Sequence, residues 1–161
     1  IKENRLLNWH LSYNKVIKIL NEFAENKKLN IVIKRKNKFV YKTNLKINNK
    51  IKVYEDGHAN AFVNNADIII TQNSGATIDS LVNGKIVMVP FFEKNNMKKF
   101  LYNFNKEIIY TSEEEMKKKI KSLIGKKISF PLKKQNHNKT IEYYYGKPAK
   151  VVERYVGFLN S

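Results

Sequence analysis

The stretch ADIIITQNSGATIDSLVNGKIVMVP, residues 66–90, decides the fold. It begins with an apolar run over 68–70, which is typical of a strand that is buried on both faces. Small polar residues over 71–77 interrupt the run, and a short amphipathic segment follows, with Gly84 as its C-terminal cap. A second apolar run then ends at Pro90. The stretch therefore predicts a strand, a turn, a helix and a second, parallel strand.

The rest of the chain continues this alternation of strands and helices. Ser112 and Glu115 have the spacing of a capping box, and Gly125 is expected to end the helix that they begin. The alternation predicts an α/β fold, a Rossmann-like open parallel sheet with helices on both faces. Hydrophobic spacing predicts one or two helices over 5–27, further helices over 59–65, 112–124 and 147–160, and strands over 30–36, 51–57 and 106–111.

The length of 161 residues corresponds to a single domain. We expect an N-terminal helical segment over 1–27 and an α/β core with a C-terminal helix over 28–161. No apolar run approaches the roughly 20 residues of a transmembrane helix, and the absence of cysteine excludes disulfides, thiolate metal sites and a cysteine nucleophile. The chain begins at Ile1 without a signal sequence, so we expect an excerpt of a longer, cytoplasmic protein.

The net charge of +17 raises the question of an anionic partner. Lysine supplies 28 of the positive charges and arginine only 3, and the chain also contains 22 Asn, a composition that A/T-rich codons produce. Nucleic-acid sites favour arginine, so no dedicated nucleic-acid partner is expected. A nucleotide diphosphate or an anionic membrane surface fits better. The basic helix around 117–127 is either a solvated face or a peripheral membrane contact.

The turn over 73–77 is the clearest candidate for a binding site. Asn73 or Ser74 is placed to cap the following helix, and Gly75 removes a side chain where backbone amides lack partners. Such amides and the helix dipole attract anions, and Thr77 adds a hydroxyl. The alternative is a well-capped tight turn without a ligand. The turn contains neither a Walker loop nor a dinucleotide fingerprint.

Residues 64–92, NNADIIITQNSGATIDSLVNGKIVMVPFF, resemble the donor-nucleotide-binding segment in the C-terminal domain of two-domain, GT-B-type glycosyltransferases. The nearest members are bacterial transferases of capsular and surface polysaccharides and the CDP-glycerol glycerophosphotransferases. Their pattern is an Ala-Asp pair, a buried strand, a small-residue turn, an acidic residue in the helix, a Gly-Lys pair and a returning strand. The resemblance extends over about residues 28–160.

The resemblance implies a set of donor-binding residues. Asp79 would contact the ribose, although glutamate is commoner at this position. Many members have a Lys-Pro-His-Pro stretch after the first strand, where this chain reads IKRKNKF, so Lys34 and Arg35 are secondary phosphate candidates, or the solvent-facing end of a strand. Contacts to the donor phosphates would come from Asn73, Ser74, Gly75, Ala76 and Thr77.

The resemblance also implies a reaction. A sugar or polyol phosphate would pass from a nucleotide-activated donor to a surface or capsular polysaccharide at the inner face of the cell envelope, with no metal and no other cofactor. The acceptor and the catalytic base would belong to an N-terminal domain of the same protein, so this domain would be inactive alone. Within this chain His58 is the catalytic candidate, with an ordinary turn residue as the alternative. A nucleotide-sugar epimerase, a nucleic-acid-binding module and a non-catalytic scaffold remain as alternatives.

Overall fold

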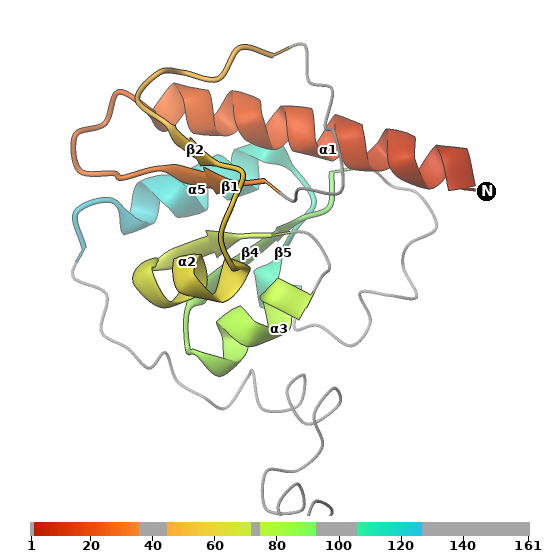
Figure 1. Ribbon diagram of the computed structural model, residues 1–161. Helices are drawn as coiled ribbons and strands as arrows, with labels where there is room; N and C mark the ends of the chain where they lie inside the picture. The colour runs from red at the N-terminus through yellow and green to blue at the C-terminus, as the bar shows by residue number, and fades with distance from the viewer. Residues whose placement is uncertain (1, 36–44, 72–74, 93–105, 127–161) are drawn as a thin grey trace, which may run out of the picture.

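The computed structural model describes residues 2–35, 45–71, 75–92 and 106–126, with the backbone alone for 2–11 and 106 (Figure 1). Strands and helices alternate along the chain, as the sequence predicts. The strands are β1 (Val32–Lys34), β2 (Lys52–Tyr54), β3 (Ile68–Ile70), β4 (Ile86–Pro90) and β5 (Ile109–Tyr110). The helices are α1 (Lys2–Phe23), α2 (Ala59–Asn65), α3 (Gly75–Val82), α5 (Glu113–Leu123) and the 3₁₀-helix η1 (Lys106–Ile108).

All strand pairs in the described residues are parallel, which confirms the predicted α/β fold. In β3 and β4 the pairs run from Ile68 with Ile86 to Ile70 with Met88, and the Thr71 amide donates to the Met88 carbonyl at 3.0 Å. The stretch 66–90 thus forms the β3–α3–β4 unit that its hydrophobic pattern predicts. Unlike the prediction of a strand buried on both faces, the three residues of β3 are only partly buried.

The strands form two short sheets instead of one continuous sheet. One sheet has the order β1–β2 and the other the order β3–β4–β5. Helix α1 joins them through packing, because Ile17 and Ala24 lie in a cluster with Ile33 of β1, whereas Ile19 and Phe23 pack toward β4. Side chains of α1 therefore contact both sheets, whereas no backbone hydrogen-bond ladder joins the described strands of one sheet to those of the other.

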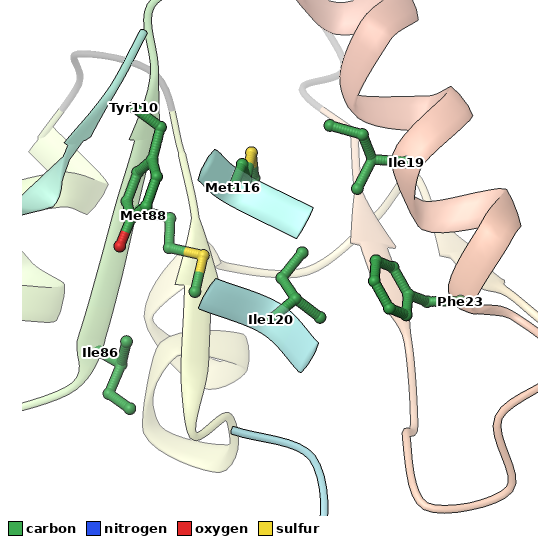
Figure 2. Close-up of a cluster of buried hydrophobic side chains, with 7 residues drawn as sticks. All are labelled: Ile19, Phe23, Ile86, Met88, Tyr110, Met116 and Ile120. Atoms are coloured by element: carbon green, nitrogen blue, oxygen red, sulfur yellow. The ribbon is translucent and has the colours of Figure 1, made fainter. Parts of the chain in front are cut away.

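Strand β4 is the centre of the core, and all five of its residues are buried. Ile86 and Met88 point toward α1 and α5, where Met88 and Met116 are fully buried (Figure 2). Val87 and Val89 pack with Ile78 and Leu81 of α3 on the other face. Figure 1 accordingly shows α1 and α5 on one side of the strands and α2 and α3 on the other. Helices thus cover both faces of this sheet.

Helix α3 ends in a Schellman motif, which confirms Gly84 as its cap. Gly84 has a φ of 65°, its amide donates to the Leu81 carbonyl, and the Lys85 amide donates to the Ser80 carbonyl, both at 3.0 Å. The Lys85 ammonium also donates to the carbonyl of Asn64 near the end of α2, at 2.9 Å. The Gly-Lys pair therefore ends one helix and ties it to the preceding one.

Helix α5 begins as predicted. The Ser112 hydroxyl accepts a hydrogen bond from the Glu115 amide at 3.1 Å, while the Glu115 carboxylate accepts one from the Thr111 hydroxyl at 3.3 Å. The ammonium of Lys117 lies 2.7 Å from the Glu22 carboxylate of α1, and this hydrogen bond raises the pKa of Lys117. Lys117 therefore anchors α5 to α1 and is not a purely solvated residue.

Two sequence predictions differ in detail from the structure. The segment 5–27 belongs to one continuous helix, α1, which ends at Phe23. The run over 106–111 begins as the 3₁₀-helix η1 and has strand geometry only at 109–110. The helix predicted over 147–160 lies outside the described residues. None of the helices in the described ranges is long and apolar enough to cross a membrane.

Candidate anion-binding site

The predicted turn lies at the carboxyl end of β3. The β3–β4 ladder continues to the Thr71 amide, and α3 begins at Gly75. In an open parallel sheet this edge is the usual place for a ligand, because strand ends meet helix starts there. Asn73 and Ser74 lie outside the described residues. Of the predicted phosphate contacts, the structure thus places Gly75, Ala76 and Thr77, which form the first three positions of α3.

The first turn of α3 is suited to an anion in both charge and space. It contains no acidic residue. Gly75 is exposed, and a Cβ built on it would meet no atom of the described residues within 4 Å outside its chain neighbours and its own helix backbone. Its backbone does not require glycine either, because its φ is not among the positive ones, which within the described residues belong to Gly57, Gly84 and Gly125. Neither packing nor strain therefore explains this glycine, and it leaves room beside the helix start.

The Thr77 side chain lies inside the fold. Its exposed fraction is 0%, as is that of Ser80 one turn later, and the Ser80 hydroxyl donates to the Ala76 carbonyl at 2.6 Å. Ile78 and Leu81 complete this wide buried face of α3. No part of Thr77 is exposed in this arrangement, so the hydroxyl that the sequence predicts to face a ligand lies inside the fold.

Asp79 is partly exposed in the middle of α3. It is four residues from Gly75, and residues with this spacing lie above one another on the same helix face. Its backbone carbonyl accepts hydrogen bonds from the amide of Asn83 at 3.0 Å and from the side-chain amide of Asn83 at 2.7 Å. A carboxylate thus lies one turn from the open helix start, on the same side.

Lys34 and Arg35 lie at the carboxyl end of the other sheet. The Lys34 ammonium donates to the carbonyls of Arg35 and Glu55, the latter at 2.6 Å, and the Arg35 guanidinium lies 3.1 Å from the Glu55 carboxylate. The Arg35 Nε is buried without a hydrogen-bond partner. Both cations therefore join the ends of β1 and β2, and a role toward phosphate would be additional to this one.

His58 occupies the N-cap position of α2. It is exposed, and its side chain makes no capping hydrogen bond, while its carbonyl accepts from the Ala61 amide at 3.1 Å. The preceding Gly57 has a φ of 94°, a left-handed conformation that glycine adopts readily in a turn. His58 thus lies at a helix start beside the carboxyl end of β2.

Sequence reasoning missed Glu55 and Tyr110, which lie near strand ends. Glu55 pairs with Arg35 across β1 and β2. Tyr110 is the last residue of β5 and is only 9% exposed; burial raises its pKa, and the charge of Glu115 raises it further. Parallel pairing brings the carboxyl ends of neighbouring strands together, so the last residues of each predicted strand were the available signal.

The described part of the chain has a much smaller net positive charge than the whole chain. Among the side chains that the structure describes, fifteen are Lys or Arg and ten are Asp or Glu. The remaining lysines and arginines belong to other segments of the sequence. The structure describes no group of three His, Cys, Asp or Glu residues that could hold a metal ion.

The chain matches no protein-family model, no curated protein and no solved structure. An assignment of function therefore depends on the geometry around α3 together with the pattern of residues 64–92.

Proposed function

We propose that the chain is the donor-nucleotide-binding domain of a GT-B-type glycosyltransferase. The reaction is the transfer of a sugar or polyol phosphate from a nucleotide-activated donor to a surface or capsular polysaccharide. The observation that supports this proposal best is the start of α3. It follows the partly buried parallel strand β3, has no acidic residue in its first turn and has open space at Gly75. These properties fit a diphosphate group.

The first turn of α3 would act through its backbone. The amides at a helix start point along the helix axis toward the ligand, and the dipole adds partial positive charge. As the bond to the donor breaks, negative charge develops on the leaving diphosphate or phosphate, and fixed amides stabilise this charge without reorganising. Asp79, one turn along the same face, would accept hydrogen bonds from ribose hydroxyls.

The acceptor and the catalytic base would come from a separate N-terminal domain across the cleft. The proposal places the enzyme in the bacterial cytoplasm, where nucleotide-activated donors are made. This chain alone should then bind nucleotide without transferring a sugar. His58 and the Lys34–Arg35 pair lie at other strand ends of the same domain and remain secondary candidates.

The test is a thermal-shift panel with UDP, CDP, CMP and GDP. A ligand present at one hundred times its Kd stabilises the folded state by about 2.7 kcal/mol. We expect at least one nucleotide to raise the Tm of the wild-type chain. Gly75→Asp places a carboxylate at the open helix start. The helix dipole stabilises this negative charge, but the charge repels a phosphate that would bind at the same place. This variant should fold and lose the nucleotide response.

Asn60→Asp is the matched control. It also adds one carboxylate to the first turn of an exposed helix start, that of α2. The proposal requires Asn60→Asp to keep the full nucleotide response. If no nucleotide stabilises the wild-type chain, or if both variants lose the response equally, α3 is an ordinary helix start and the proposal is wrong.

A further inference from the structure

The second half of α5 and the turn that follows it contain basic residues and no acidic ones. Residues 116–126 contain five lysines and no Asp or Glu, whereas the acidic residues of this helix are confined to 113–115, its first turn. Lys117 is paired with Glu22 and is therefore not counted as free charge. The other lysines of this segment are exposed. The helix is thus acidic at its start and basic along the rest of its length.

A lysine from a distant part of the sequence joins this surface. A Cβ built on Gly125 would lie 3.5 Å from both Cδ and Nζ of Lys28, so the Lys28 side chain extends over the turn that ends α5. Lys121 lies one helical turn before Gly125, and Lys118 lies three residues before Lys121. We name the set Lys28, Lys118, Lys121 and Lys126 the α5 lysine surface.

Local stabilisation does not account for this surface. Cations near a helix C-terminus interact with the dipole, but the effect falls off within the last turn. Of the four residues, only Lys121 lies in the last turn of α5. Lys118 has Glu114 one turn before it, which offsets part of its charge, but Lys28 and Lys126 lie outside the helix. Within the described part of the chain, the surface therefore presents more positive than negative charge.

We propose that the α5 lysine surface docks the protein on the anionic headgroups of a lipid bilayer. Lysine is a hydrated point charge on a flexible stem, which suits the diffuse negative potential of a membrane surface. Nucleic-acid recognition favours arginine and aromatic stacking platforms. Arg35 is the only arginine among the described side chains and directly follows β1. Tyr54, the only strongly exposed aromatic residue described, lies on β2. The proposal does not depend on nucleotide binding by α3.

Vesicle co-sedimentation of the chain tests the proposal at low and at 0.15 M salt. Vesicles of phosphatidylcholine alone are compared with vesicles that contain phosphatidylglycerol. We expect binding to the anionic vesicles only, weakened by salt. Each lysine near an anionic surface changes partitioning by about fivefold, so Lys121→Gln with Lys126→Gln should weaken binding roughly 25-fold.

Lys46→Gln with Lys52→Gln is the matched control, because it removes the same charge from exposed positions in and before β2. The control should change binding by less than about twofold. Far-ultraviolet circular dichroism should show that both variants fold, since all four side chains are exposed. Equal losses in the two variants would show that net charge alone attracts the chain and would overturn the proposal. Equal binding to neutral vesicles, or tighter binding to a single-stranded oligonucleotide than to anionic vesicles, would also overturn it.

Discussion

Helices α3 and α5 both begin where a parallel strand ends, but their first turns differ in charge. The start of α5 has a Ser112 cap and three consecutive glutamates, Glu113, Glu114 and Glu115, so the protein itself supplies the negative charge that a helix start attracts. The start of α3 has no acidic residue and has an exposed glycine with open space beside it. Two helices in equivalent positions thus differ in the charge of their described first turns, acidic in α5 and uncharged in α3.

The largest expected effect on stability concerns β4, the strand against which both helices pack. Met88 of β4 is fully buried and packs with Met116 of α5, while its neighbours Val87 and Val89 pack against α3. Met88→Ala should lower the free energy of unfolding by about 2–5 kcal/mol, because a buried cavity replaces the side chain. Urea denaturation measures the change. A loss below about 1 kcal/mol would show that β4 is not the common base of α3 and α5.

The end of α3 provides the next test. Gly84→Ala forces an L-residue into a left-handed conformation and should destabilise the fold by about 1–2 kcal/mol. Gly84→Asn is the control, since asparagine tolerates this conformation better, and it should restore part of the loss. Equal stability of the wild type and Gly84→Ala would contradict the Schellman geometry at Lys85 and Gly84.

The start of α5 should respond to removal of its cap. Ser112→Ala removes the hydroxyl that accepts from the Glu115 amide and should cost about 1 kcal/mol. Ser112→Asp keeps an accepting oxygen and should restore most of the stability. If Ser112→Ala is neutral in chemical denaturation, the start of α5 is not completed by the protein itself, and the contrast with α3 weakens.

The smallest expected effect is at the start of α3. Gly75→Ala places a methyl group in open space at a backbone conformation that alanine adopts, so stability should stay unchanged or rise by up to about 1 kcal/mol. Thermal unfolding without ligand measures this change. Clear destabilisation would mean that the fold itself requires glycine here, which would remove the main argument for a ligand at this position.

The sequence predicted those features that depend on neighbouring residues. Periodicity predicted α2 with the observed bounds 59–65, the β3–α3–β4 unit, the Gly84 cap and the Ser112 cap. Each of these follows from residues within about one helical turn of one another, or from an apolar run of a few residues.

The features that the sequence did not predict depend on contacts between distant segments. The division into two sheets and the packing of α1 against both involve residues that no local pattern connects. Burial of Thr77 depends on how α3 rotates on the sheet, and the Lys85 bond to the Asn64 carbonyl joins two helices across the chain. A small polar side chain at a helix start looks the same in sequence whether it faces a ligand or the core.

The most direct test of the proposed site is a nucleotide titration of the ¹⁵N-labelled chain followed by amide NMR shifts. CDP and UDP should shift the amide resonances of Gly75, Ala76 and Thr77, while those of Glu113, Glu114 and Glu115 stay in place. This result would show that the uncharged helix start takes the anion and the acidic one does not. Shifts that are absent from α3, or equal at the starts of α3 and α5, would contradict the account.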